Sequence, residues 1–301
     1  MNLRQLGVYF SAMLAMIFWA LSFIWYKEVL VQYPPISLVL MRLIISVVLL
    51  YAFTVATGKL NRLHLKDLKY FVALAFFQPF LYFLCESYGV SLVSSTLASV
   101  IISTIPLLSP VGAYLVLKER ITPMNFLGLA ISFIGVSLVI FHRGFHLNNV
   151  NPVGILCLFV AVFAAVVYAL IIKKLSSEYN VFSIVTYQNT LGIIYFLPLF
   201  LFFDFKEFAG IVPSRGVILS LLKLGVFAST FAFVLFTHAI KNLGVTRANI
   251  FTNTIPVFTA IFAYYLLNEA ITPMKIVGIA IVVAGLSLSQ VRKGSPAPKG
   301  R

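Results

Sequence analysis

ASVIISTIPLLSPVGAYLVLKERITPM, residues 98–124, recurs 150 positions later as ANIFTNTIPVFTAIFAYYLLNEAITPM, residues 248–274. Over the longer windows 98–144 and 248–294, 19 of 47 positions are identical without a gap. Chance similarity between apolar segments produces scattered leucine and isoleucine matches. It does not readily reproduce T-I-P, E-x-I-T-P-M and two glycines at a single offset. The chain therefore contains an internal repeat.

The composition indicates the solvent in which this repeat folds. Of the 301 residues, 61% are hydrophobic and 10% are charged, and the mean hydropathy is +1.04. A soluble domain carries about 25% charged residues, so this chain is expected to fold in lipid. Ten apolar runs approach the length that a bilayer-spanning helix needs, and they cover residues 7–26, 36–57, 70–90, 96–117, 124–141, 153–172, 182–203, 218–240, 246–267 and 274–291. The runs are continuously apolar, which argues against a transmembrane β-barrel.

The repeat divides the predicted spans into two halves, residues 1–147 and 148–301. Each half holds five spans, and because five is odd, the second half must enter the membrane upside down. The predicted fold is therefore an all-α membrane protein with ten transmembrane helices in two inverted five-helix repeats. Inverted repeats are typical of secondary transporters, which bind their substrate near the midplane at the repeat interface.

The positive charges predict the orientation of these helices. With the N-terminus inside, 15 of the 22 Lys and Arg residues fall in cytoplasmic segments and 6 fall outside, while Arg42 lies within a span. Both termini, including a short basic C-terminal tail, are thus predicted to be cytoplasmic in a multi-pass inner (plasma) membrane protein. The net charge of +14 is explained by loops beside anionic lipid headgroups, and no nucleic-acid partner is expected.

These features resemble the EamA family of the drug/metabolite transporter superfamily. The resemblance rests on the two five-helix halves, on Phe18-Trp19 in an aromatic-rich first span, and on the paired T-I-P and L-x-E-x-I-T-P motifs at 104–123 and 254–273. It implies ten helices around a central cavity, alternating access, and usually the export of amino acids or other small metabolites. Some relatives move nucleotide sugars, sugar phosphates or cationic drugs.

Glu86 is the ionisable residue that lies deepest in a predicted span. An ionisable side chain at such a position costs about 2.5–3.5 kcal/mol on insertion scales and usually faces a cavity or a partner. Gln78 and Tyr82 precede Glu86 at intervals of four residues, so the three form one polar stripe on a helix. Glu86 is a candidate for substrate contact or proton coupling; the alternative is a hydrogen-bonded residue that joins two helices.

Arg42 lies about a third of the way into the second span. It is a candidate charge partner for Glu86 or for an anionic substrate group, and the alternative is structural pairing or snorkelling toward the headgroups. An offset of 146, set by Tyr33/Tyr179 and Ser37/Ser183, places Gln188 at the position equivalent to Arg42. Gln188 and Asn189 are therefore predicted to form a second polar point in the cavity.

The T-I-P copies predict helix kinks at Pro106 and Pro256, because proline removes a backbone donor and disfavours a straight helix before it. Polar residues with helical spacing precede each proline, and they are predicted to line the cavity or to join helices through hydrogen bonds: Ser99, Ser103, Asn249 and Asn253.

Further candidates come from the first, sixth and eighth spans. Trp19, Ser22 and Tyr26 share one helix face, and Tyr168 is the predicted counterpart of Ser22. The aromatic rings suit a hydrophobic or cationic substrate, with a position in the membrane-interface belt as the alternative for Tyr26. His238 is a second proton-coupling candidate, although a structural role is also open for it.

The remaining motifs indicate structural rather than substrate-binding roles. Glu119 and Glu269 precede I-T-P at predicted helix ends, where capping or a gate are the alternatives. The repeated glycines indicate close helix packing, either within one chain or in a dimer, and we expect a monomer or a weak homodimer. The two cysteines and four histidines form no metal-ligand pattern, so no metal and no cofactor are expected.

Taken together, the sequence predicts a non-enzymatic secondary transporter with a small-molecule substrate and the lipid bilayer as its partners. The chain has no Walker A sequence, so direct ATP hydrolysis is not expected. It also lacks the clustered acids or histidines of an intramembrane metalloenzyme. The alternatives that share this fold are a lipid flippase or scramblase and a carrier of nucleotide sugars or phosphorylated metabolites.

Overall fold

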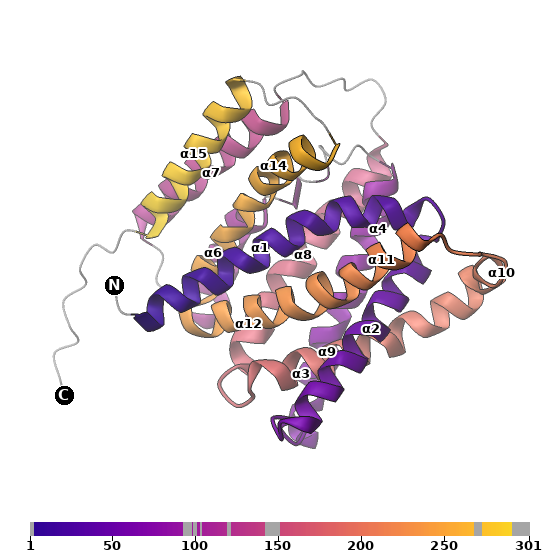
Figure 1. The fold of residues 1–301 in the computed structure, drawn as a ribbon. Helices are drawn as coiled ribbons and strands as arrows, with labels where there is room; N and C mark the ends of the chain where they lie inside the picture. The colour runs from indigo at the N-terminus through magenta and orange to yellow at the C-terminus, as the bar shows by residue number, and fades with distance from the viewer. Residues whose placement is uncertain are drawn as a thin grey trace.

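The computed structural model describes residues 3–92, 98, 101–102, 104–118, 122–141, 151–267 and 273–290. Within these ranges the regular structure is entirely helical (Figure 1). The helices are α1 (Leu3–Leu30), α2 (Pro35–Ala56), α3 (Leu65–Ala75), η1 (Phe76–Leu81), α4 (Tyr82–Leu92), α6 (Ile105–Leu117), α7 (Pro123–Phe141), α8 (Pro152–Leu175), α9 (Val181–Leu199), η3 (Phe200–Asp204), α10 (Phe205–Ala209), α11 (Arg215–Lys223), η4 (Leu224–Phe231), α12 (Ala232–Leu243), α13 (Val245–Ile250), η5 (Phe251–Thr254), α14 (Ile255–Leu267) and α15 (Pro273–Gln290).

Five helical stretches in this part of the chain are long and apolar enough to cross a membrane. They are Gln5–Leu30, Pro35–Ala56, Leu65–Leu92, Pro152–Leu175 and Arg215–Leu243, and they coincide with the first, second, third, sixth and eighth predicted spans. Large apolar side chains remain exposed along these helices: Phe10 is 66% exposed, Val48 62% and Phe163 58%. Exposed apolar surface on this scale marks contact with lipid.

The third of these stretches is broken in its middle. Gln78 has φ −153° and ψ 122°, which is extended backbone inside a run that is otherwise helical. Pro79 explains the break, because proline has no N–H and pushes the preceding residue out of the α region. The equivalent part of the second half, 150 positions later, is the π-helical η4. Stretches of this kind occur often at functional sites.

The T-I-P prolines also lie at changes in helix geometry. In the second copy, the 3₁₀ segment η5 separates α13 from α14 immediately before Ile255-Pro256. In the first copy, Pro106 is in the first turn of α6. Ser99 and Ser103, which precede it, lie outside the described residues, and so do Glu119 and Glu269.

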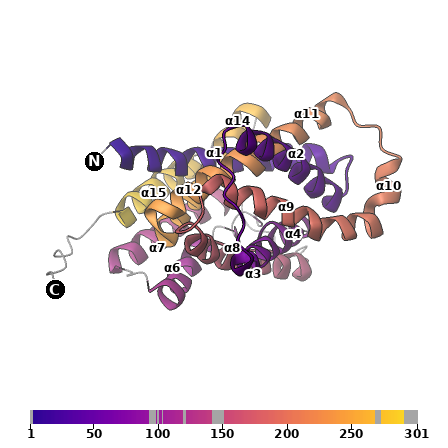
Figure 2. The ribbon, with the colours of Figure 1, turned by 90° about the horizontal axis from the view of Figure 1, so that it is seen from below.

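The central helix of the bundle is α8, which packs against α4, α6, η1 and α12. The helices α7 and α15 form a separate pair at one edge, as a second view also shows (Figure 2). Asn125 Nδ2 donates to Ser289 O at 2.5 Å, and the Ser132 hydroxyl donates to Val282 O at 3.4 Å. Residue numbers rise on one helix as they fall on the other, so this pair is antiparallel.

The repeated glycines allow this close approach within one chain. A Cβ added at Gly128 would lie 2.6 Å from Gly285 O, and one added at Gly135 would lie 2.8 Å from Gly278 O. No real Cβ tolerates backbone at such distances. The glycines therefore join the α7–α15 pair, which is the intramolecular alternative of the two that the sequence left open.

We expect Gly285→Ala to destabilise the protein, because its Cβ would lie 2.6 Å from Ser132 N and 2.7 Å from Gly128 O. Overpacking of this kind costs about 1–3 kcal/mol, which thermal unfolding in detergent would detect. Gly7→Ala is the matched control, since nothing lies within 4 Å of its new Cβ. Equal melting temperatures for both variants would contradict the proposed packing.

Candidate functional site

A cavity lies in the middle of the bundle, between α1, α2, the η1–α4 stretch, α6, α8, α12 and the α13–α14 stretch. Its volume is about 80 Å³, enough for several water molecules. Most of the polar residues singled out by the sequence are on its wall: Trp19, Ser22, Tyr26, Arg42, Gln78, Tyr82, Glu86, Tyr168 and Asn249. Tyr26 is 7% exposed, so it faces the cavity rather than a membrane interface.

Arg42 is held on this wall as a buried cation. Its side chain is 2% exposed, so it does not snorkel to a membrane surface. Its Nε donates to the Ser229 hydroxyl at 2.6 Å, and its guanidinium carbon lies 4.4 Å from the centre of the Phe83 ring. A cation over an aromatic face is attracted by the ring's quadrupole. Both contacts fix the guanidinium while other N–H groups remain free to meet a ligand.

Glu86 supplies an acidic side chain to the same cavity. The Tyr82 hydroxyl donates to Glu86 Oε1 at 2.9 Å, which follows from their spacing of one helical turn. Beside them, the Tyr26 hydroxyl and the Ser87 hydroxyl share a short hydrogen bond. Among the described residues, no ion pair joins Glu86 to Arg42. The cavity wall therefore carries one acidic and one basic side chain that do not form an ion pair with each other.

Aromatic rings form the rest of the wall. The Trp19 ring centre lies 5.4 Å from that of Phe233 and 4.9 Å from that of Phe236, both in edge-to-face geometry. The Trp19 indole also donates to Ala228 O at 3.3 Å, which fixes its orientation. Phe83 lies 5.9 Å from Phe233 in the same way. Such contacts stabilise this aromatic part of the wall.

The sequence did not single out the remaining lining residues, which are the apolar Phe23, Phe83, Val90, Ile102, Ile105, Ala165, Phe233, Phe236 and Ile255 and the polar Thr252. The repeat offset offers a signal for some of them. Phe83 and Phe233 stand 150 positions apart, as do Glu86 and Phe236. Searching for pairs at this offset around the polar stripe would have found the facing aromatic wall.

Asn189 lies behind the cavity wall in a satisfied polar cluster. Its Nδ2 donates to the Ser46 hydroxyl at 2.8 Å and to Ser229 O at 3.1 Å, and the Ser46 hydroxyl donates to Ser229 O at 3.0 Å. Ser229 thus accepts hydrogen bonds from α2 and α9 while its hydroxyl supports Arg42. This cluster positions the cation, although Asn189 itself does not line the cavity.

Three other predicted residues are also absent from the lining. Gln188 is fully buried next to Asn189, and Asn253 is 1% exposed between Thr252 and Thr254. His238 is partly buried near the end of α12, where Asn242 Nδ2 donates to its carbonyl at 2.7 Å. None of the three lines the cavity in this conformation.

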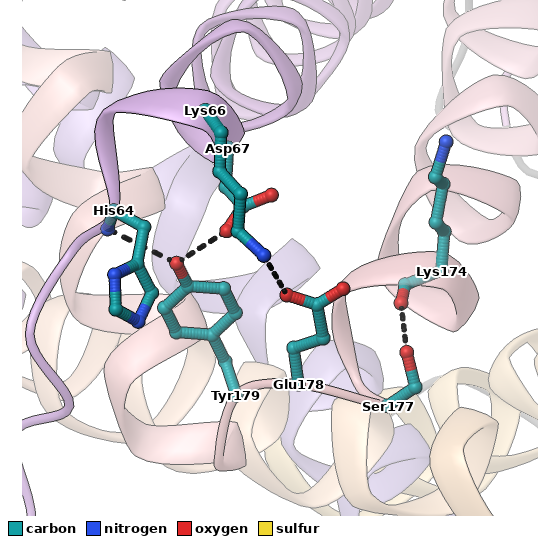
Figure 3. Close-up of polar contacts among 7 residues, drawn as sticks. All are labelled: His64, Lys66, Asp67, Lys174, Ser177, Glu178 and Tyr179. Carbon is teal, nitrogen blue, oxygen red and sulfur yellow. Dashed lines mark hydrogen bonds and ion pairs between the residues drawn. The ribbon is translucent and has the colours of Figure 1, made fainter.

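On one side of the cavity, two segments from opposite halves are bound together; we call this contact the clamp. It joins residues 59–67 with residues 174–183, and Figure 3 shows the part of it around Tyr179. The Tyr179 hydroxyl donates to Asp67 Oδ2 at 2.8 Å and accepts from His64 N at 3.2 Å. Burial raises the pKa of this hydroxyl above its ordinary value, so it is protonated at neutral pH and acts as the donor.

Asn61 is the second centre of the clamp. Its Oδ1 accepts from Asn180 N at 2.9 Å and from Asn180 Nδ2 at 2.6 Å, and its own N–H donates to the Ser183 hydroxyl at 2.7 Å. The Lys66–Glu178 ion pair, 3.5 Å long, is mostly exposed and adds little. On the side of α12, Lys241 Nζ donates to Tyr179 O at 3.4 Å.

The equivalent helix starts form a contact at the opposite end of α2. Asp204 Oδ2 accepts from both the backbone N and the hydroxyl of Ser37, each at 2.9 Å, and the Tyr33 ring lies 5.5 Å from that of Phe208. Tyr33 and Ser37 are the repeat equivalents of Tyr179 and Ser183. The two contacts at opposite ends of α2 thus share one pair of repeat-equivalent residues each, a tyrosine and a serine. The described residues show no cluster of His, Cys, Asp and Glu that could hold a metal ion.

Tyr179→Phe should loosen the clamp, because it removes the donor to Asp67, a side chain that is only 6% exposed. Leaving such an acceptor unpaired costs about 1–3 kcal/mol, measurable as a lower melting temperature in detergent. Tyr265→Phe, at a position 73% exposed, is the control for the loss of a hydroxyl. If both variants melt alike, the Tyr179–Asp67 bond does not hold the clamp.

Comparison with known proteins identifies the family to which the chain is similar. A model of the EamA-like transporter family matches residues 6–141 and 152–290. The chain is 27% identical to the uncharacterized transporter YetK of Bacillus subtilis, over 97% of this chain and 89% of the relative. It is 30% identical to an uncharacterized transporter of Archaeoglobus fulgidus, over 91% and 95%. One crystal structure superposes with a TM-score of 0.78 at 17% identity, covering 94% of both chains, and so shares the fold.

Proposed function

The chain belongs to the EamA-like transporter family, and we propose on this premise that it is a secondary active transporter that exports amino acids or related small amphipathic metabolites by alternating access. The family and its transporter-named relatives indicate a membrane transporter rather than an enzyme. The substrate, the direction and the coupling are our proposal.

The observation that carries the proposal is the pair of separated charges in the cavity. Arg42 and Glu86 line one cavity without forming an ion pair, and the wall around them is largely aromatic. A zwitterion with an apolar body complements this arrangement, because its carboxylate pairs with the guanidinium and its ammonium pairs with Glu86. Buried charges are costly when they lack a partner, so such a ligand would stabilise the site.

We also propose that the chain crosses the membrane ten times as two inverted repeats. The antiparallel packing of α7 against α15 supports this, because these helices carry equivalent sequence and an inversion reverses the direction of one of them. The excess of Lys and Arg on the side of the clamp supports cytoplasmic termini in the inner membrane. The α7–α15 glycines pack within the chain, which supports a monomer or a weak homodimer.

In this mechanism the clamp is the cytoplasmic gate. Alternating access requires each closure to open in turn while the other stays closed. The clamp and the contact of Ser37 with Asp204 each contain a repeat-equivalent tyrosine and serine, which supports a rocking motion of one half against the other. The substrate enters from the clamp side, binds between Arg42 and Glu86, and leaves past Asp204.

Glu86→Gln is expected to lower export and to remove its response to an imposed pH gradient. Proteoliposomes loaded with tritiated L-amino acids would report the efflux, with the most effective amino acid chosen by thermal shift. Losing a charged hydrogen bond to substrate lowers the flux by about tenfold or more. Glu207→Gln, an exposed acid on α10, is the matched control.

Two results would contradict the proposal. If the Glu86→Gln variant exports at the wild-type rate and keeps the wild-type pH response, Glu86 takes part in neither substrate binding nor proton coupling. A wild-type protein that moves no amino acid but flips a fluorescent lipid would favour the scramblase alternative.

Cross-linking the clamp tests the gate directly. Lys66 and Glu178 are exposed and adjacent, so cysteines in their places can be joined by a short, reducible bis-thiosulfonate reagent. We expect the joined protein to stop exporting tritiated amino acids and to resume when the reagent is reduced. Each single cysteine variant, treated in the same way, controls for modification alone. Full transport by the cross-linked protein would show that this contact does not open.

A further inference from the structure

Three buried polar side chains meet beside the cavity without hydrogen-bond partners. Tyr168 from α8 is 2% exposed, and Gln188 from α9 and Thr237 from α12 are both fully buried. The Tyr168 hydroxyl, both amide atoms of Gln188 and the Thr237 hydroxyl have no partner. Tyr168 lies within hydrogen-bonding range of both Gln188 and Thr237, but no pair among the three has the geometry of a full hydrogen bond. We call these residues the neutral trio.

Such an arrangement is costly, since each buried polar atom without a partner loses its hydration and gains nothing in return. The neighbouring side chain shows that this helix can satisfy an amide, because Asn189 donates to Ser46 and Ser229. Thr246, Asn253 and Thr259 also have buried polar atoms without partners, but the trio brings three such side chains together, which indicates a partner that this conformation does not supply.

The trio lies between the cavity and the clamp. Tyr168 lines the cavity, and the clamp-side residues of the same three helices lie about one to one and a half turns farther along. These are Lys173 on α8, Ser183 on α9 and Lys241 on α12. Lys173 Nζ donates to Lys241 O at 3.0 Å, so α8 and α12 are tied together on the clamp side of the trio. The trio therefore lies on the part of these three helices that joins the cavity wall to the clamp side.

The repeat gives a second, independent reason to assign a ligand here. At an offset of 146, Gln188 is equivalent to Arg42 and Tyr168 to Ser22, and both first-half residues line the cavity. At an offset of 150, Thr237 is equivalent to Ser87, which is bonded to the lining residue Tyr26. In alternating access, each inverted half adopts the conformation that the other half has in this structure. The trio would then line the cavity, as the equivalent residues of the first half do now.

We propose that Tyr168, Gln188 and Thr237 form a second polar station, which binds the charged head group of the transported zwitterion when the clamp is open. The inference rests on the proposed transport function. The trio offers two hydroxyls and one amide, which donate to a carboxylate or accept from an ammonium. Because the trio is neutral, it holds the head group less tightly than Arg42 and Glu86 do. A weaker station on the route lets the substrate move on instead of trapping it.

Two nearly isosteric substitutions test this assignment: Gln188→Met and Thr237→Val. Each removes polar atoms that lack partners, which is neutral or stabilising for a fold, so the melting temperature in detergent should stay the same or rise. The efflux of tritiated L-amino acids from proteoliposomes should nevertheless fall about three- to tenfold, the value of a typical hydrogen bond. These variants should thus keep or raise the melting temperature while lowering the efflux. A purely structural role of the trio would instead lower both together.

Matched controls use the same chemistry elsewhere. Thr259 on α14 also has a buried hydroxyl without a partner, but it lies outside the cavity lining and on a helix that contributes to neither the trio nor the clamp. Thr259→Val should therefore leave both stability and efflux close to wild type. Asn189→Leu should lower the melting temperature, because it breaks two hydrogen bonds.

The outcomes separate this inference from the proposed function. If wild type exports and both trio variants export equally well, the station is overturned while transport stands. If efflux falls only in proportion to a lowered melting temperature, the trio is structural and the station is again overturned. A wild-type protein that moves no tritiated amino acid overturns both the function and the station.

Discussion

The physical constraint on which this structure depends is the cost of a polar group in lipid. Water is not available inside the bilayer core, so every polar atom must find its partner within the protein. Most polar side chains here obey this rule: Asn189 and Ser46 converge on Ser229, and Ser37 is paired with Asp204. Against this background of satisfied groups, the exceptions are informative, and they include Arg42 and Glu86 in the cavity, which form no ion pair with each other, and the neutral trio beside it, whose polar atoms lack partners.

The repeat uses the same positions for related tasks in the two halves. The glycines of each copy join one antiparallel helix pair, and the tyrosine and serine that begin α2 have equivalents at the start of α9, where they form the clamp. In the cavity the two halves differ. Arg42 and Glu86 carry charge in the first half, whereas the second half has Gln188 and Phe236 at the equivalent positions. The acidic and the basic side chain of the cavity wall thus both come from the first half.

Several features of the site could be predicted from sequence because they depend on local spacing. The stripe of Gln78, Tyr82 and Glu86 follows from helical periodicity, and in the structure all three line the cavity with Trp19 and Asn249. The break at Gln78-Pro79 was not predicted, because a proline in a membrane-spanning run either kinks the helix or interrupts it, and only the packing of neighbouring helices decides which. The aromatic wall was not predicted either, since phenylalanine is so common in this chain that its facing positions cannot be separated from lipid-facing ones.

The sequence by itself determined the solvent, the helical class and the division into two related halves, because composition, run length and repetition are properties of the chain alone. It also identified the residues that lipid makes costly. Only the tertiary structure decided which of them face one another: Arg42 lies in the same cavity as Glu86, Asn189 lies behind its wall, and Gln188 lies unpaired toward the clamp. Neighbours in sequence point to different faces of a helix, and their surroundings depend on helices far away in the chain.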